Sequence, residues 1–407
     1  MPHLRRSRSG LRKLASAFCS HFALPTSHFA LRTSHFAFPT SHCALETCPV
    51  EPETERVMNI PAIEPVRIGD RLVGSGQSVF VVAEMSANHG QDFDRAVGII
   101  QAARRAGADA IKVQTYTPDT LTIDSDRPEF RHGSGSLWAG QTLYELYREA
   151  FMPWDWQPQL KAIAEDLGLI FFSTAYDRTS VDFLANLDVP AIKISSFELV
   201  DTPLIEYAAG VGKPLIISTG MGTLQEIEAA VDAARAGGCR DLVLLKCTSA
   251  YPAPPGEMNL TTIPSLSEQL RCPVGLSDHS TSTLAAIVGT TLGACALEKH
   301  LTLEKGQGID GGFSLDPTEL AATVAAIRDT EAALGSPRFE PTESERQSLH
   351  FRRSLWVVRP VEAGDPITQE NVRSIRPAGG LPPSRWKQQK GKPFRKGSTD
   401  PRPLREE

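Results

Sequence analysis

Several features that would place a protein in a special class are missing from this sequence of 407 residues. No apolar run reaches the ~18 residues that a membrane-spanning helix requires. An excess of positive charge is missing too, since 42 Lys and Arg stand against 48 Asp and Glu, for a net charge of −6 at pH 7. We therefore expect neither a membrane nor a nucleic acid among the partners of this protein.

Cysteine spacings that hold a metal or form a disulfide framework are also missing. The seven cysteines are scattered along the chain at Cys19, Cys43, Cys48, Cys239, Cys247, Cys272 and Cys295. Reduced thiols of this kind are usual for proteins of the cytoplasm. We expect a cytoplasmic protein whose cysteines are unpaired.

The first part of the chain is a repeat rather than a domain. Residues 20–47 contain four copies of a seven-residue unit, and each copy begins with Ser-His. Pro25 and Pro39 would break a coiled-coil helix of that period, and solenoid repeats are usually ~20 residues or longer. We expect residues 1–57 to be a low-complexity tail that is disordered or lies upstream of the true start, with Met58 as initiator.

From residue 79 onward, short apolar runs rich in β-branched residues alternate with amphipathic segments. The predicted strands are 79–84, 109–114, 169–174, 191–196, 214–219, 242–248, 273–279 and 294–300. The amphipathic segments between them include 93–105, 157–167, 180–187, 224–235 and 282–292. This alternation indicates a parallel sheet covered by helices, and eight such units in about 250 residues fit a (β/α)8 TIM barrel of the α/β class. A doubly wound open sheet is the alternative, but no Gly-x-Gly-x-x-Gly follows any of the predicted strands.

Polar side chains gather at the ends of the predicted strands, where the active sites of this fold lie. They are Glu84, Lys112, Gln114, Lys193, Ser196, Glu198, Ser218, Ser249, Ser277, His279, Glu298 and His300. Any one of them alone fits an ordinary strand-end residue. Lys112 and Lys193 are harder to explain in that way, because an ammonium inside an apolar strand is costly unless an anion meets it. Two such lysines with several hydroxyls describe a pocket for a small, doubly charged anion such as a phosphate ester.

Two of these strands end in a histidine that closely follows a carboxylate. Asp278 directly precedes His279, and Glu298 lies two residues before His300. Two neutral imidazoles at adjacent strand ends can hold a divalent cation and leave further positions open, as a catalytic metal needs. The alternative is that each is a hydrogen-bonded histidine of the protein core.

A second, smaller unit follows the predicted barrel. The last barrel helix is predicted over 317–334, and Gly335 and Pro337 end it. We expect a catalytic barrel domain over 58–335, a polar linker over 336–350 and a β-rich domain over 351–407 whose basic end, 387–407, is frayed. A unit of about 60 residues has only a marginal core of its own.

Taken together, the motifs resemble the sialic acid synthase family. The matching strings are Ala-Glu-Met-Ser-Ala-Asn-His at 83–89, Gly-Ala-Asp-Ala-Ile-Lys at 107–112, Ile-Ser-Thr-Gly-Met at 217–221, Gly-Leu-Ser-Asp-His at 275–279 and Glu-Lys-His at 298–300. The second unit, with Ser-Ile-Arg-Pro at 374–377, resembles the antifreeze-like (SAF) domain of that family. Strings at 137–140, 143–150, 153–156 and 193–198 are similar to its pseudaminic acid synthase branch, with Phe197 where other branches usually carry Gly.

The resemblance implies that the protein condenses phosphoenolpyruvate (PEP) with an open-chain amino sugar and water, and releases phosphate by C–O cleavage. It implies that PEP is bound by Lys112, Lys193, Ser196, Ser218, Ser249 and Ser277. It places a divalent metal on His279 and His300, Mn²⁺ first and Mg²⁺ or Co²⁺ as alternatives, where the metal polarises the sugar aldehyde. Glu84 would guide proton transfer, as an acid or as a base. The sugar would meet Gln114, Glu198, Tyr251, Asp310 and, from the partner subunit of a homodimer, Arg376.

Three alternatives remain open. The same chemistry on another sugar would give N-acetylneuraminic or legionaminic acid, and the sugar contacts are where this chain departs from the family, with Asp-Gly-Gly-Phe-Ser at 310–314 in place of Asp-Ser-Ala-Phe-Ser. A Schiff-base aldolase would use Lys112, Lys193 or Lys246 and would work without a metal. A carbohydrate-binding protein built on an inactive barrel would release no phosphate with any sugar.

Overall fold

The structure is a computed structural model that describes residues 63–133 and 138–406. The predicted tail, including its repeat and Met58, lies outside the described residues. Within the described ranges, no helix is both long and apolar enough to cross a membrane. The four cysteines in these ranges, Cys239, Cys247, Cys272 and Cys295, are buried and unpaired, as the sequence predicts.

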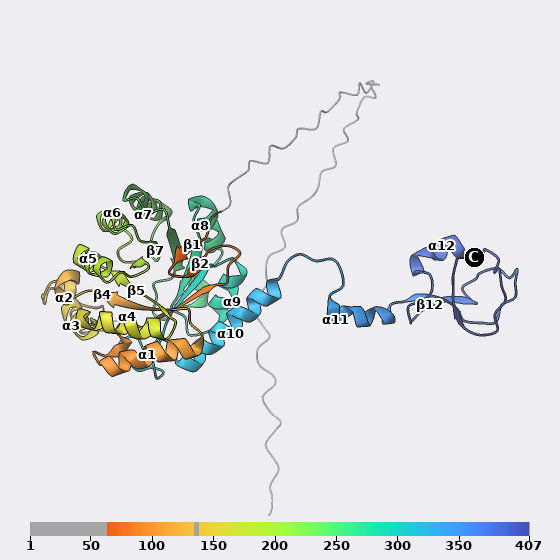
Figure 1. The fold of residues 1–407 in the computed structure, drawn as a ribbon, viewed down its shortest axis with the longest axis horizontal. Helices are drawn as coiled ribbons and strands as arrows, with labels where there is room; N and C mark the ends of the chain where they lie inside the picture. The colour runs from red at the N-terminus through yellow and green to blue at the C-terminus, as the bar shows by residue number, and fades with distance from the viewer. Residues whose placement is uncertain (1–62, 134–137, 407) are drawn as a thin grey trace, which may run out of the picture. The chain divides into compact units, whose positions relative to one another are not determined.

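Eight parallel strands close into a barrel that is surrounded by helices (Figure 1). The strands are β3 (Phe80–Glu84), β4 (Ala110–Thr115), β5 (Ile170–Ala175), β6 (Ile192–Ile194), β7 (Leu215–Ser218), β8 (Leu242–Cys247), β9 (Val274–Asp278) and β10 (Ala296–His300). Each overlaps one predicted strand. The last strand, β10, pairs with the first, β3, from Ala296 opposite Phe80 to His300 opposite Glu84. This closure confirms the TIM barrel and excludes the doubly wound open sheet.

The helices around the barrel follow the predicted alternation. They are α1 (Phe93–Ala106), α4 (Gln157–Asp166), α5 (Arg178–Asn186), α6 (Thr202–Gly210), α7 (Leu224–Ala236), α8 (Thr262–Leu270), α9 (Leu284–Thr291) and α10 (Pro317–Leu334). The sequence pattern does not single out α6 and α8. Helix α6 is apolar almost all round, and α8 contains an internal proline, Pro264, so neither shows a clear polar face.

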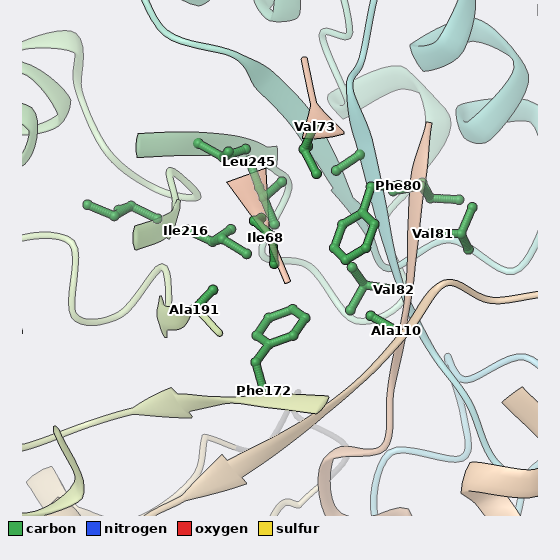
Figure 2. Close-up of a cluster of buried hydrophobic side chains, with 14 of the residues drawn as sticks. Ile68, Val73, Phe80, Val81, Val82, Ala110, Phe172, Ala191, Ile216 and Leu245 are labelled. Carbon is green, nitrogen blue, oxygen red and sulfur yellow. The ribbon is translucent and has the colours of Figure 1, made fainter. Parts of the chain in front are cut away.

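A short antiparallel hairpin that the sequence did not predict fills the N-terminal end of the barrel. Its strands are β1 (Val66–Ile68) and β2 (Arg71–Val73). Figure 2 shows Ile68 and Val73 among Phe80, Phe172 and other side chains of the barrel interior. Strands of three residues carry too little alternation to be recognised, although these side chains are fully buried.

The connection from β4 to α4 is the longest one on the barrel and carries structure of its own. It contains α2 (Pro118–Leu121), a 3-10 turn (Pro128–Phe130), α3 (Leu143–Ala150) and a second 3-10 turn (Trp154–Trp156). Long loops at the carboxyl ends of barrel strands are where this fold places substrate contacts.

The C-terminal unit is built on a three-stranded antiparallel sheet in the order β12-β11-β13, compatible with a SAF domain. The elements after the barrel are α11 (Glu343–Arg346), a 3-10 turn (Gln347–Phe351), β11 (Ser354–Val357), β12 (Val372–Ile375), a 3-10 turn (Pro383–Arg385), α12 (Trp386–Gln389) and β13 (Arg402–Pro403). The segment 336–350, predicted as a polar linker, thus contains α11 and most of a 3-10 turn.

The basic end of the chain, 387–407, differs from the frayed tail that its composition suggests. Phe394 and Leu404 are buried in the small core of this unit, together with Leu355 and Val372. Strand β13 pairs with β11, placing Arg402 opposite Val357. Two buried apolar side chains, together with backbone hydrogen bonds such as that from the N–H of Leu404 to the oxygen of Leu355, hold this segment on the sheet.

Candidate active site

A cavity of about 510 Å³ lies at the carboxyl ends of the barrel strands. Most residues that the sequence predicts for the site line it, namely Lys112, Gln114, Lys193, Ser196, Glu198, Ser218, Ser249, Tyr251, Ser277, His279, His300 and Asp310. Glu84 is fully buried and reaches this group through Lys112 and Gln114. Arg376 belongs to the C-terminal unit, where it is exposed directly after β12. The structure thus brings the predicted residues of the barrel together and places Arg376 on a different unit.

Glu84 and Lys112 face each other on the neighbouring strands β3 and β4. The ammonium Nζ of Lys112 lies 2.7 Å from Oε2 of Glu84 and 3.8 Å from Oε2 of Glu298, and it donates to Oγ1 of Thr174 at 3.0 Å. Burial by itself would lower the pKa of Lys112, but the two carboxylates raise it above its usual value. Lys112 is therefore a charged group that already has a carboxylate partner within the barrel.

Gln114 connects this ion pair to the loop after β3. Its Nε2 donates to Oε1 of Glu84 and to Oγ of Ser86, both at 2.9 Å. Gln114 lies two residues after Lys112, so the alternation of side chains along β4 turns both toward the barrel interior. One short strand therefore supplies both partners of the Glu84 carboxylate.

Lys193 is the cation of the cavity that has no carboxylate partner. Its Nζ donates to Oγ of Ser218 at 2.7 Å and to the backbone oxygen of Ile194 at 2.9 Å. No ion pair joins Lys193 to a carboxylate in the described part of the chain. Burial lowers the pKa of Lys193 below its usual value. An anion bound in the cavity would meet this ammonium without displacing a carboxylate.

The hydroxyls of Ser196 and Ser249 lie close to the backbone of Gly220. Ser196 accepts a hydrogen bond from the backbone N–H of Gly220 at 3.0 Å. A Cβ atom at Gly220 would collide with the side-chain oxygens of Ser249 and Ser196. Glycine at this position therefore leaves room for both hydroxyls at the cavity wall.

The two histidines lie side by side, with ring centroids 5.2 Å apart. His279 Nδ1 is 3.2 Å from the backbone oxygen of Thr248. His300 Nδ1 is buried without a hydrogen-bond partner, 3.6 Å from Oδ2 of Asp310. Burial would raise the pKa of Asp310, but the neighbouring His300 lowers it below its usual value.

His279 and His300 by themselves offer two nitrogen ligands to a divalent metal. In residues 63–133 and 138–406, no group of three or more His, Cys, Asp or Glu side chains is arranged to hold a metal ion. The unpartnered nitrogen of His300 nevertheless makes it a poor fit to a hydrogen-bonded core histidine. The pair fits a metal that takes its other ligands from water and substrate.

Two further residues at the site received no role from the sequence. Glu298 accepts from Oγ of Ser277 at 3.1 Å; burial would raise its pKa, but Lys112 and Lys193 lower it to about 2. Cys247 lines the cavity with its Sγ 3.8 Å from Nδ1 of His279. Glu298 is named among the strand-end residues of the sequence without a role, and Cys247 could have been found from side-chain alternation, because it lies two residues before Ser249.

Known proteins resemble this chain over most of its length. Residues 99–338 match the NeuB family. The chain is 41% identical over 317 residues to a pseudaminic acid synthase of Campylobacter jejuni, covering 78% of this chain and 92% of that protein. It is 36% identical over 318 residues to an N,N'-diacetyllegionaminic acid synthase of Legionella pneumophila, covering 76% and 89%.

Solved structures support the same assignment. An N-acetylneuraminic acid synthetase of Leptospira borgpetersenii superimposes with a TM-score of 0.63 at 30% identity, covering 71% of this chain and 96% of that one. The spore coat polysaccharide biosynthesis protein SpsE of Bacillus subtilis gives a TM-score of 0.58 at 29% identity, covering 82% and 96%. The family match and the curated relatives agree with the barrel fold, and the chain belongs to the NeuB family of sialic acid synthases.

Proposed function

We propose that this protein is a pseudaminic acid synthase. It condenses PEP with the open-chain form of a 2,4-diacetamido-2,4,6-trideoxyhexose (6-deoxy-AltdiNAc) and water, and it releases phosphate. The observation that carries the proposal is the cavity at the strand ends, where two buried lysines and several hydroxyls lie beside a pair of histidines. The similarity to pseudaminic acid synthases at 41% identity supports this choice among sugar acids.

PEP is an anion with a phosphate and a carboxylate, and it matches the cationic side of the cavity. Lys193 receives one of its anionic groups, because this ammonium has only neutral partners, Ser218 Oγ and a backbone oxygen. The other PEP contacts come from Lys112 and from the hydroxyls of Ser196, Ser249 and Ser277, which line the same cavity. Charge-assisted hydrogen bonds of this kind are about twice as strong as neutral ones.

The reaction forms one carbon–carbon bond and breaks one carbon–oxygen bond. The methylene carbon of PEP attacks the aldehyde carbon of the sugar, water adds to C2 of PEP, and phosphate leaves with the oxygen that joined it to C2. Glu84 guides the proton transfer that accompanies water addition, from its position between Lys112 and Gln114. Gln114, Glu198, Tyr251 and Asp310 meet the polar groups of the sugar at the cavity wall.

His279 and His300 would hold a divalent metal, Mn²⁺ in the first place and Mg²⁺ or Co²⁺ as alternatives. When bound, such an ion supplies Lewis-acid polarisation of the sugar aldehyde. The protein's contribution is to hold the two imidazoles at neighbouring strand ends, with Asp310 close to His300.

The C-terminal unit would complete the site from a second subunit. Arg376 is exposed and lies at the end of β12, so its guanidinium is available to another molecule. In the homodimer that we propose, Arg376 of each subunit reaches the sugar in the other subunit's barrel.

A phosphate-release assay tests the function. The purified protein is incubated with PEP, Mn²⁺ and one of three acceptors: 6-deoxy-AltdiNAc, the legionaminic acid precursor or N-acetylmannosamine. We expect the highest kcat/KM with 6-deoxy-AltdiNAc and loss of turnover after treatment with EDTA. A preference for another acceptor would reassign the protein to a legionaminic or N-acetylneuraminic acid synthase, and absence of phosphate release with all three would contradict the proposal.

The Schiff-base alternative has a separate test. Lys246 is not part of the cavity lining, and its Nζ donates to Oγ1 of Thr248 at 2.7 Å. Lys112 is ion-paired with Glu84, and Lys193 is the ammonium that we propose to bind PEP as a cation, so borohydride treatment with pyruvate should leave the mass of the protein unchanged. A covalent adduct, together with activity that survives EDTA, would favour the aldolase.

A further inference from the structure

The cavity is lined by apolar side chains as well as by charged and hydroxyl groups. Helix α3 turns four side chains toward the cavity, Leu143, Leu146, Tyr147 and Ala150, and we call these the α3 face. Their spacing of three, four and seven residues places them on one side of the helix. Apart from the Tyr147 hydroxyl, the α3 face is apolar, whereas most charged and hydroxyl groups of the cavity come from the barrel strands and the segments that follow them.

The α3 face lies outside the two large apolar clusters of the molecule. Leu146 and Ala150 are buried apolar residues, only 6% and 7% exposed. Among the described residues, neither they nor Leu143 and Tyr147 belong to the apolar cluster of the barrel or to that of the C-terminal unit. Apolar side chains that line a cavity beside a few convergent polar groups are usual for a ligand pocket.

The first turn of helix α3 is stabilised by its own capping box, and its last turn is tied to Gln91. At its start, Thr142 and Glu145 form a capping box, with the N–H of Thr142 donating to Oε2 of Glu145 at 2.9 Å and the N–H of Glu145 donating to Oγ1 of Thr142 at 3.1 Å. At its end, Nε2 of Gln91 donates to the backbone oxygen of Arg148 at 2.8 Å. A wall that is anchored in this way can discriminate between ligands of different shape and polarity.

We propose that the α3 face selects the acceptor sugar by contacting its methyl groups, those of C6 and of an acetamido group, and that it disfavours acceptors with a hydroxyl on C6. This inference rests on the proposed function. A hydroxyl placed against Leu146 or Ala150 would lose hydrogen bonds to water without gaining others. Discrimination by one apolar group in a pocket amounts to roughly 10- to 200-fold in kcat/KM.

The central test is Leu146→Asn, assayed with 6-deoxy-AltdiNAc and with N-acetylmannosamine, which carries a hydroxyl on C6. We expect kcat/KM for the 6-deoxy sugar to fall at least 10-fold through a higher KM, and the ratio of the two kcat/KM values to shift toward N-acetylmannosamine. The Kd for PEP, measured by calorimetry, should stay unchanged because the charged groups of the cavity are untouched.

Two matched variants control for general damage. Leu146→Met keeps the volume and the apolar character, and Glu149→Gln changes an exposed residue of the same helix; both should keep the acceptor ratio of the unmodified protein. Ala150→Ser, on the same face, replaces Leu146→Asn if that variant has a lowered Tm.

The outcomes separate the inference from the function on which it rests. An unmodified protein that uses 6-deoxy-AltdiNAc, with variants whose acceptor ratio stays the same, would overturn the inference alone. An unmodified protein that releases no phosphate with this sugar would overturn the proposed function.

Discussion

At the scale of single residues, Lys112 and Lys193 have different environments, although the sequence pattern predicts the same role for both. Lys112 has a carboxylate partner at 2.7 Å, whereas the acceptors of Lys193 among the described residues are neutral. The alternation of side chains shows that both point into the barrel, but the difference depends on Glu84 in the neighbouring strand. Lys193 is therefore the residue whose loss should act most directly on an anionic substrate.

We predict that Lys193→Met weakens PEP binding by roughly 10- to 100-fold, because a hydrogen bond to a charged group contributes about 1.5–3 kcal/mol. Calorimetric titration with PEP measures the effect. Lys246→Met is the matched control, since Lys246 is also a buried lysine in a barrel strand but does not line the cavity. Equal losses in both variants would mean that the effect is structural.

We predict that His279→Ala or His300→Ala abolishes phosphate release and leaves the Kd for PEP within about threefold of its original value, since PEP is held by cations and hydroxyls. Mn²⁺ titration of each variant, followed by its electron paramagnetic resonance signal, should show weakened metal binding. A parallel loss of PEP affinity in both variants would contradict this division of roles.

At the scale of elements, strands β9 and β10 are joined on the outer side of the barrel by a buried ion pair. Nζ of Lys299 lies 2.7 Å from Oδ2 of Asp278 and also donates to the backbone oxygen of Ser280. These residues flank His279 and His300 in the sequence but point away from the cavity, as alternation requires. The pair therefore links the two strand ends that carry the histidines.

We predict that Lys299→Met lowers the free energy of unfolding by about 3–5 kcal/mol, because it leaves the Asp278 carboxylate buried without a partner. The double variant Lys299→Met/Asp278→Asn should recover much of this loss, since no unpaired charge remains. Urea denaturation of the single and double variants measures both values. A double variant as unstable as Lys299→Met would show that the buried charge is not the cause.

At the scale of the whole molecule, the C-terminal unit has its own small core and carries the arginine that the family resemblance places at the sugar site. Inactive Glu84→Ala and inactive Arg376→Ala subunits, mixed under conditions that allow exchange, are predicted to regain part of their activity. In each mixed dimer, one barrel keeps Glu84 and receives Arg376 from its neighbour. Verified mixed dimers without activity would place the action of Arg376 within its own chain or remove it from the site.

The sequence by itself determined the barrel, its strand order and many of the polar residues of the cavity. Eight apolar runs of strand length, with helices between them and no Gly-x-Gly-x-x-Gly after any strand, favour a barrel over an open sheet, and alternation turns residues such as Lys112 and His300 inward. The relatives found by similarity carry the same family assignment.

Only the tertiary structure decided which groups meet. Closure of β10 on β3 brings His300 beside Glu84, far apart in the chain, and it also brings the Glu298 carboxylate within 3.8 Å of Lys112. The hairpin of β1 and β2 and the inward turn of the α3 face are likewise set by packing, because three-residue strands and a two-turn helix carry too little pattern of their own. The local sequence pattern predicts the face of the strand or helix on which a side chain lies. Its hydrogen-bond and ion-pair partners, in contrast, depend on contacts between segments that are distant in the sequence.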